Sequence, residues 1–525
     1  MEARSLYRME WFKGLLLGGL VLVLLVAFLP GCSGLPSLEG RSVTRVDRET
    51  GDTFLGRTVQ PLIAAHPGLS GIRPLQDAHD AFAARVLLAQ VAERTLDVQY
   101  YIWRNDMTGT LLFHALHQAA ERGVRVRLLL DDNNTAGLDP ILAALNSHPN
   151  IEVRLFNPIT TRKFRWIGYL TDFSRLNRRM HNKSFTIDNQ ATVIGGRNVG
   201  DEYFGATEGV LFADLDVLAI GPVVEAVSED FDRYWASGSS YPVERILPAV
   251  SEEVQRQLTE KAKALEQDPA AAAYMKALRQ SDFVQEMHQG GLAFEWAETR
   301  LVSDDPAKGL GLAAPEKLLT ARLAEILEIP QTDVELVSPY FVPTAAGVKA
   351  FAEIARQGVA VRILTNALEA TDVALVHSGY AKRRKELLEA GIRLYELRRE
   401  AATPIDEDKH KIFGSSGSSL HAKTFSVDRS HVFVGSFNFD PRSADLNTEM
   451  GLVIHSPALA QQIEAQFNDR IPLSAYEVRL DENGQLYWLE RRDGQLLRHD
   501  TEPGTTFWQR AGVYLMSLLP IEWLL

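Results

Sequence analysis

This sequence has almost no cysteine and no excess of positive charge. Its 525 residues include one cysteine, Cys32, so no intramolecular disulfide is possible and the fold must depend on its core. The 55 Lys and Arg residues face 68 Asp and Glu residues, which gives a formal net charge of −13. Nucleic-acid-binding proteins need a basic surface to meet phosphates, so this balance argues against a nucleic-acid partner.

Metal-binding patterns are also missing. The sequence contains no HExxH and no CxxC, which are common sequence signs of metal and redox sites. We therefore expect neither a metal ion nor another cofactor. Hydrophobic residues make up 46% of the chain and charged residues 23%, as in a globular protein with a substantial core.

One long uncharged apolar run lies at the amino end, over residues 14–29. Basic residues precede it, and this order is typical of an export signal. The following Leu29-Pro30-Gly31-Cys32 resembles the bacterial lipobox, with Pro30 as a departure, and predicts lipidation of Cys32. The alternative is an uncleaved membrane anchor, for which the run is short. Either interpretation places the rest of the chain in the bacterial cell envelope, on the periplasmic side of the membrane.

Two stretches about half a chain apart have similar sequence patterns. Each offers a strand rich in β-branched residues, then a helical stretch, then a second strand that starts with Gly-Val. Strands alternating with helices predict an α/β fold with mixed or mostly parallel sheets, and the half-chain spacing indicates a duplication. The expected elements are residues 96–102, 109–122 and 123–130 in the first copy and residues 332–338, 346–356 and 358–364 in the second.

Within this repeat, one set of polar residues recurs at identical spacing. In a strand, positions i and i+2 face the same side, so each histidine and lysine should point together into one cleft. Each aspartate should open a tight turn, and the strand after the turn should bring an asparagine back toward the cleft. The matched residues are His181, Lys183, Asp188 and Asn198 in the first copy, and His421, Lys423, Asp428 and Asn438 in the second.

This set of side chains suits phosphodiester chemistry. Two lysines can neutralise the anionic phosphodiester and stabilise charge in the transition state. One imidazole can attack phosphorus and form a covalent intermediate, while the other protonates the leaving alcohol and deprotonates the incoming one. A reactive imidazole needs an orienting carboxylate, and Asp214 and Glu449, which take equivalent places in the two copies, are the candidates.

The paired segments resemble the HKD motifs of the phospholipase D superfamily, over about residues 75–470. The resemblance implies an α/β fold of two pseudo-twofold-related phospholipase D-like α/β/α lobes, with mixed sheets and one active site between them. It also implies that His181 is the nucleophile and His421 the acid and base, although the residues alone allow the reverse. The expected organisation is a signal or anchor over 1–40, a first lobe over 41–240, a helical linker over 241–300, a second lobe over 301–470, and a hairpin with an apolar membrane-associating tail over 471–525.

Two further segments bear on the substrate. A basic stretch interleaved with aromatic residues runs directly into His181. It is expected either to receive an anionic lipid headgroup with its rings in the membrane or to be a solvated loop. The apolar carboxyl end, over residues 507–525, suits either a bilayer interface or a helix docked on the core. The predicted headgroup ligands are Arg162, Lys163, Arg165, Arg178 and Arg179.

With its Leu-Pro-Ile-rich tail, the chain is similar to bacterial cardiolipin synthases of the third class. That resemblance implies transfer of a phosphatidyl group from one phospholipid to phosphatidylglycerol through a phosphohistidine, with membrane phospholipids and the membrane itself as partners. Two alternatives stay open. One is a phospholipase D or phosphodiesterase hydrolase, in which water takes the intermediate. The other is an inactive lipid-binding scaffold of the envelope, against which the two intact motifs argue.

Overall fold

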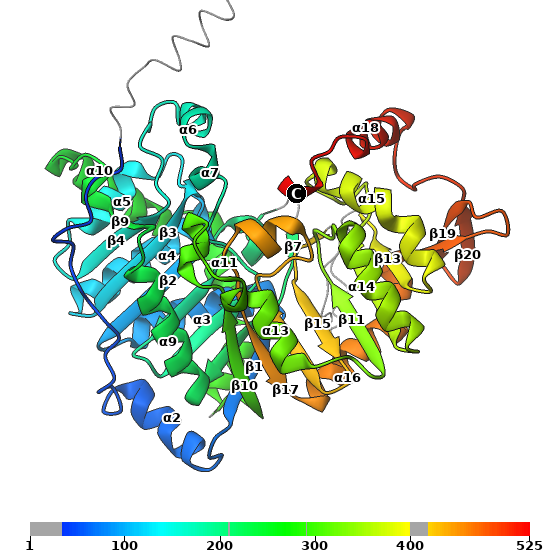
Figure 1. Ribbon diagram of the computed structural model, residues 1–525. Coiled ribbons are helices and arrows are strands. Elements are labelled where there is room, and N and C mark those ends of the chain that lie inside the picture. The colour runs from blue at the N-terminus through cyan, green and yellow to red at the C-terminus, as the bar shows by residue number, and fades with distance from the viewer. Residues whose placement is uncertain (1–33, 208–210, 290, 400–417) are drawn as a thin grey trace, which may run out of the picture.

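The computed structural model describes residues 34–207, 211–289, 291–399 and 418–525. The predicted export signal or anchor, with its lipidation site Cys32, lies outside these residues. Within them, no helix is both long and apolar enough to cross a membrane. Figure 1 shows two lobes side by side, each a sheet covered by helices.

The first lobe is built on a mixed sheet. Its strands are β1 (Ser70–Leu75), β2 (Thr95–Ile102), β3 (Arg125–Asn134), β4 (Ile151–Phe156), β5 (Ser184–Ile187), β6 (Ala191–Gly195), β8 (Asp216–Ile220) and β9 (Ser240–Pro242). They lie in the order β9-β4-β3-β2-β5-β6-β8-β1. Strands β2, β3 and β4 are parallel, and the other pairs are antiparallel. The strands predicted over 96–102 and 123–130 are thus β2 and β3.

Helices cover both faces of this sheet. The helices of the first lobe are α2 (Phe54–Ala64), α3 (Ala78–Val91), α4 (Met107–Glu121), α5 (Asp139–Asn146), α6 (Arg165–Thr171), α7 (Phe173–Leu176), α8 (Asp201–Phe204) and α9 (Pro222–Trp235). Neighbouring residues of β3 show the two layers, because successive side chains of a strand point to opposite faces. Leu128 packs in the cluster that contains Leu116 of α4, whereas Leu129 packs with Phe231 of α9.

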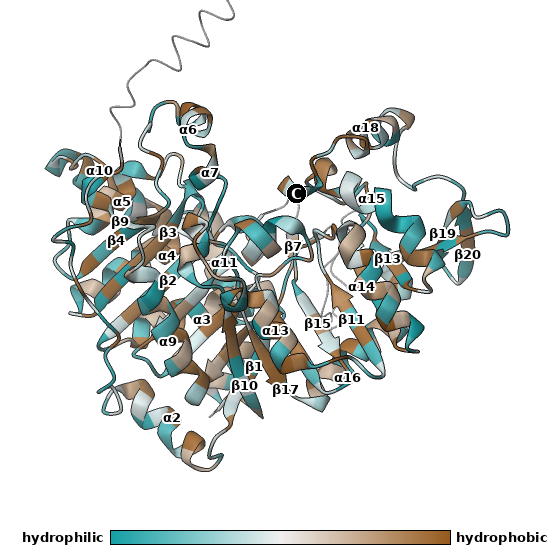
Figure 2. Cartoon of the chain, in the orientation of Figure 1, coloured by the Kyte–Doolittle hydropathy of each residue, from teal (hydrophilic) through white to brown (hydrophobic). Residues whose placement is uncertain are grey.

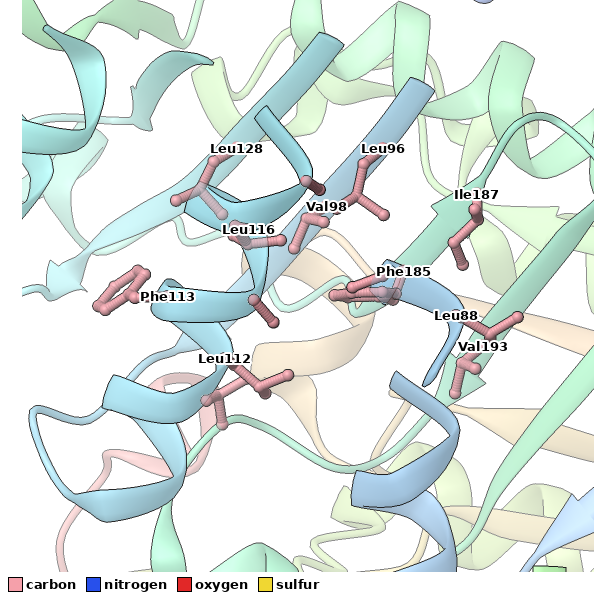
Figure 3. Close-up of a cluster of buried hydrophobic side chains, with 14 of the residues drawn as sticks. Leu88, Leu96, Val98, Leu112, Phe113, Leu116, Leu128, Phe185, Ile187 and Val193 are labelled. Atoms are coloured by element: carbon pink, nitrogen blue, oxygen red, sulfur yellow. The ribbon is translucent and has the colours of Figure 1, made fainter. Parts of the chain in front are cut away.

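The packing of α4 on the sheet illustrates how the core forms. Leu112 and Leu116 are four residues apart and therefore lie on one helix face. Figure 3 shows both leucines with Val98 of β2 and Leu128 of β3 in one cluster. All four side chains are fully buried, and each such burial contributes about 1.5–3 kcal/mol to folding.

The second lobe repeats the plan. Its strands are β10 (Glu295–Ser303), β11 (Asp333–Val337), β12 (Ala360–Asn366), β13 (Arg393–Leu397), β15 (Thr424–Val427), β16 (His431–Gly435), β17 (Met450–His455), β18 (Ala475–Leu480), β19 (Leu486–Arg492) and β20 (Gln495–His499). Its helices are α13 (Leu319–Leu327), α14 (Thr344–Arg356), α15 (Ala374–Glu389), α16 (Pro457–Ala465), α17 (Ile471–Ser474) and α18 (Phe507–Ser517). The order β17-β16-β15-β11-β12-β13-β18 again surrounds a parallel trio, β11, β12 and β13.

Strand β10 joins the lobes. Its first residues pair with β1 and its remaining residues pair with β17, so the two sheets are continuous. Buried apolar residues from both lobes meet beside this junction, including Ile194 and Val217 from the first and Val434 and Leu452 from the second. Figure 2 shows this central region as strongly apolar. The predicted duplicated α/β fold is confirmed.

The segments outside the repeat attach to one lobe each. Helices α10 (Glu252–Glu266), α11 (Pro269–Arg279) and α12 (Asp282–His288) contact helices of the first lobe. Tyr274 and Phe283 belong to that lobe's core, so the predicted linker is packed rather than free. At the other end, β18 pairs with β13 and α18 packs on α15. The second-lobe sheet therefore extends beyond residue 470, and its last two turns fall at Asn483-Gly484 and Asp493-Gly494.

Candidate active site

Each motif histidine lies where its own lobe meets the other. The backbone N–H of His181 donates to Thr448 O at 2.9 Å, and that of His421 donates to Ala213 O at 2.8 Å. Each acceptor carbonyl belongs to the residue just before a predicted orienting carboxylate. The backbone thereby sets each histidine beside the acid of the opposite lobe.

The side chains complete two pairs across the lobes. The Nδ1 atom of His181 lies 2.8 Å from Glu449 Oε2, and the Nδ1 atom of His421 lies 2.5 Å from Asp214 Oδ2. All four side chains are buried. Neither lobe therefore holds a complete pair, and the site exists only when the lobes meet.

Two buried lysines accompany the histidines. The ammonium groups of Lys183 and Lys423 each donate to the carbonyl oxygen of the histidine two residues earlier. Strand β5 begins only at Ser184, so the motif lies at the entrance of the strand rather than inside it. Burial lowers the pKa of Lys183 well below its usual value and that of Lys423 to about 8, although Asp214 and Glu449 oppose both shifts.

The two carboxylates are not equivalent. Burial raises the pKa of Glu449 to about 7, although the ammonium of Lys183 and the hydroxyl of Ser436 oppose the shift. Burial also acts on Asp214, but the charges of His421 and Lys423 outweigh it and lower the pKa of Asp214 below its usual value. Asp214 is therefore an ionised partner at neutral pH, whereas Glu449 is only partly ionised.

The pKa values of both histidines are lowered. Burial and the charges of Lys183 and Lys423 lower the pKa of His181 well below its usual value, and burial and Lys423 lower that of His421 to about 4, although Asp214 opposes the second shift. His181 Nδ1 also lies 3.1 Å from the carbonyl oxygen of Ser436. A carbonyl oxygen only accepts, so Nδ1 carries the hydrogen and the lone pair stays on Nε2. His421 Nδ1 instead faces Lys423 Nζ at 2.9 Å as well as its carboxylate.

Aromatic rings that the sequence did not single out form the walls of the site. The ring of Tyr101 lies 4.9 Å from that of His181, edge to face. His421 lies between Tyr203 at 5.2 Å and Phe212 at 5.1 Å. Tyr101 comes near the end of β2, where polar side chains of a site are expected, and that position was the available sequence signal.

The two motif asparagines are buried near the site but are bonded differently. Asn198 accepts from Ile102 N at 3.2 Å and donates to the hydroxyl of Tyr203 at 3.1 Å, so it holds the ring that flanks His421. Asn438 Oδ1 has no hydrogen-bond partner among the described residues. A buried unpaired acceptor is costly, and it suits a group that a substrate can satisfy.

The motif aspartates lie away from the chemistry. Asp188 accepts from the backbone N–H groups at the start of β2, and Asp428 accepts from those at the start of β11. Tyr101, which contacts His181, is near the opposite end of β2. The predicted catalytic role of both aspartates is therefore corrected, because their carboxylates fix strand ends.

Most of the predicted headgroup ligands are already paired. Arg162 binds Asp132 and Asp139, and Arg165 also binds Asp139. Arg179 is buried against Asp131, while Arg178 donates to backbone carbonyls of the second lobe. Only Lys163 of the five is exposed. The four arginines thus brace the loop, because they bind first-lobe aspartates and carbonyls at the lobe contact, and contact with a lipid headgroup stays a prediction for this stretch.

One buried ion pair beside the site was missed. Asp304 Oδ2 accepts from Glu449 N at 2.9 Å and from Lys308 Nζ at 2.9 Å, and Lys308 also donates to Ser443 O. The pair follows β10, which the repeat analysis did not cover. Across the described residues, no group of three His, Cys, Asp or Glu side chains is placed to hold a metal ion.

Comparisons with known proteins agree with this geometry. The family described as "Cardiolipin synthase, PLD-like domain" matches residues 87–235 and 323–471. The chain is 53% identical to Cardiolipin synthase C of Escherichia coli, over 90% of this chain and 99% of that protein. It is 24% identical to Cardiolipin synthase A of Pseudomonas entomophila, over 85% and 78% of the two chains.

A solved structure supports the fold. Phosphatidylserine synthase of Haemophilus influenzae matches 89% of this chain and 99% of its own, with a TM-score of 0.56 and 16% sequence identity. That likeness concerns the two-lobed architecture. With a family match over both lobes and a relative that aligns along most of its length, the chain belongs to the cardiolipin synthase-like family of the phospholipase D superfamily.

Proposed function

We propose that this protein forms cardiolipin by transferring a phosphatidyl group from one phospholipid to phosphatidylglycerol. The observation that carries the proposal is the pair of buried, cross-lobe histidine–carboxylate contacts with a lysine beside each. The identity to Cardiolipin synthase C supports the lipid class of the substrates. Complete motifs in both lobes argue against an inactive scaffold.

The first step uses the two histidines in different roles. Nε2 of His181 attacks phosphorus, and the bond from phosphorus to the headgroup oxygen of the donor breaks as the new P–N bond forms. His421 gives a proton to that leaving oxygen. Lys183 and Lys423 face the non-bridging oxygens and stabilise the charge that develops there.

The second step runs the same groups in reverse. His421, now neutral, takes the proton of a glycerol hydroxyl of phosphatidylglycerol. The hydroxyl oxygen attacks phosphorus, the P–N bond breaks and His181 is restored. The fixed lone pair of His181 and the ionised Asp214 behind His421 support this assignment over its reverse.

The experiment that tests the function is a lipid profile. A host without cardiolipin would express the wild-type protein or His181→Ala at equal levels. We expect cardiolipin only with the wild type. Phosphatidic acid rising without cardiolipin would identify a hydrolase, and unchanged lipids with folded protein present would exclude a phospholipid reaction by this protein alone.

We further propose that the protein works in the bacterial cell envelope, with its catalytic lobes on the periplasmic side. The basic residues, apolar run and Leu29-Pro30-Gly31-Cys32 of the amino end support an export signal with lipid on Cys32. Labelling with radioactive palmitate should mark the wild type but not Cys32→Ser. Membrane-bound protein without label would establish the uncleaved anchor instead.

A further inference from the structure

Among the described residues, the two largest groups of exposed apolar side chains lie one on each lobe. The lobe-one patch consists of Phe164, Trp166, Leu170 and Phe173, on and beside α6. The lobe-two patch consists of Trp508, Tyr514, Leu515, Leu518 and Trp523, on α18 and the carboxyl end. Trp166 is 63% exposed and Trp508 is 80% exposed. Side chains this large are seldom left in water together unless they bind something.

The two patches lie on the same side of the molecule. Figure 1 shows α6 at the upper edge of the first lobe and α18 at the upper edge of the second, with the carboxyl terminus between them. Figure 2 shows apolar residues on both helices. A single flat surface can therefore touch both lobes at once.

The lobe-one patch is held rigidly. Arg162 and Arg165, which brace the basic loop against Asp139, flank the start of α6. Tyr169 donates to Asn133 Oδ1 at 2.5 Å. These bonds join the loop to residues at and after the end of β3 while its apolar rings are exposed.

The lobe-two patch is held as firmly. A capping box formed by Thr506 and Gln509 starts α18. Beyond the helix, Glu522 binds Arg383 at 3.2 Å and Lys382 at 3.3 Å. The tail is therefore tied to α15 while its aromatic and leucine side chains face outward.

Arg442 bridges the two segments that follow the patches. Its guanidinium donates to Asn177 Oδ1 at 2.8 Å and to Asn177 O at 3.1 Å, directly after α7 of the first lobe. It also donates to Leu524 O at 3.1 Å in the tail. Arg442 is four residues after Asn438, and α7 ends five residues before His181. One side chain thus joins the ends of the two patch-bearing segments, near the motifs in the sequence.

We propose that the two patches form one docking surface for a phospholipid bilayer, which seats the mouth of the active site on the membrane. The inference rests on the proposed function, because it takes the bilayer to be the substrate source. Tryptophan and tyrosine favour the membrane interface, and leucines enter the acyl boundary. Exposed Lys163, next to the lobe-one patch, meets lipid phosphates.

The test uses the full chain, in vesicles of phosphatidylethanolamine and phosphatidylglycerol. Trp166→Ser with Trp508→Ser should lower cardiolipin formation in vesicles about tenfold, because two interfacial rings are lost. The same variant should convert dissolved short-chain phosphatidylglycerol at the wild-type rate, since neither tryptophan touches the histidines. Leu496→Ser is the matched control, because Leu496 is 61% exposed on β20 away from both patches, and it should leave both rates unchanged.

A second readout does not depend on turnover. Brominated phospholipid quenches tryptophan that enters the bilayer, and the quenching should fall in Trp166→Leu and in Trp508→Leu. Equal loss of activity on vesicles and on dissolved lipid, or quenching that neither variant changes, would overturn the docking surface. Absent transfer by the wild type with intact quenching would overturn the proposed function but keep the surface.

Discussion

The two halves of the active site share a motif but not an environment. Asp214 stays ionised beside His421, whereas burial raises the pKa of Glu449 beside His181 to about 7. The chain is therefore duplicated in its backbone and asymmetric in its electrostatics. Two identical imidazoles acquire different roles because their surroundings differ, which is how one fold separates a nucleophile from an acid.

The source of the asymmetry is traceable to single positions. Arg197 donates to Asp214 O at 2.8 Å and lowers the pKa of Asp214. Phe437 takes the place of Arg197 in the second copy. Around Glu449, the ammonium groups of Lys183 and Lys308 lower the pKa, but burial outweighs them. Burial therefore dominates at Glu449, whereas the charges of His421, Lys423 and Arg197 dominate at Asp214.

Substitution of the two histidines should give the largest difference between the two halves of the active site. We expect His181→Gln to abolish turnover and to form no covalent adduct, because it lacks the nucleophile. His421→Gln should lose about 10²–10⁴ in rate, the usual value of acid and base assistance, but should still accumulate a slow phosphatidyl adduct. Mass spectrometry of protein stopped during turnover checks both. An adduct on residue 421 in the first variant would reverse the roles.

Substitution of the orienting acids should have the next largest effect on turnover. Asp214→Asn should lower kcat about 10²-fold and Glu449→Gln about tenfold, since an outer partner of a catalytic imidazole is typically worth 10- to 100-fold. The ionised partner loses more because its charge stabilises imidazolium. Steady-state kinetics on both variants, with circular dichroism to confirm folding, makes the comparison. Equal losses would mean that the two pairs are electrostatically alike.

The pH profile should expose the same asymmetry at a smaller scale. Activity should rise as the pH passes about 7, because Glu449 then loses its proton. It should fall above about 8, because Lys423 then loses the charge that binds phosphate. In Glu449→Gln the rise should disappear and the fall remain. A rise that persists in that variant would assign it to another group.

The repeat explains how much of this was predictable. Spacing alone paired the histidines and lysines and matched Asp214 with Glu449, because a duplication aligns equivalent positions. Local strand patterns also placed β2, which was predicted over 96–102 and spans Thr95–Ile102. Such signals depend on nearby residues, and these elements are regular.

Contacts between distant segments could not be predicted. The arginines before His181 read as headgroup ligands, since the sequence does not show that Asp131 and Asp132 at the end of β3 reach them. The exchange of acids between lobes, and the link through Arg442, likewise depend on how the two sheets meet. The grouping of the motif aspartates with the catalytic residues has a related cause. Spacing identifies a position in a hairpin, but it does not show which end of the strand carries the chemistry.

Those aspartates offer the finest comparison of the two halves. In Asp188→Asn, one oxygen that accepts from Glu93 N becomes an amide that donates. A partly buried N–H then loses its acceptor, which costs at most about 1–3 kcal/mol. In Asp428, Oδ1 accepts from the N–H groups of Gln331, Thr332 and Asp333, and Oδ2 only shares that of Gln331. An asparagine therefore keeps an acceptor for all three. Asp428→Asn should therefore cost less than Asp188→Asn in thermal melting. Activity per folded molecule should fall less in either variant than in Asp214→Asn, because neither carboxylate reaches the histidines. A larger fall would mean that these aspartates take part in catalysis.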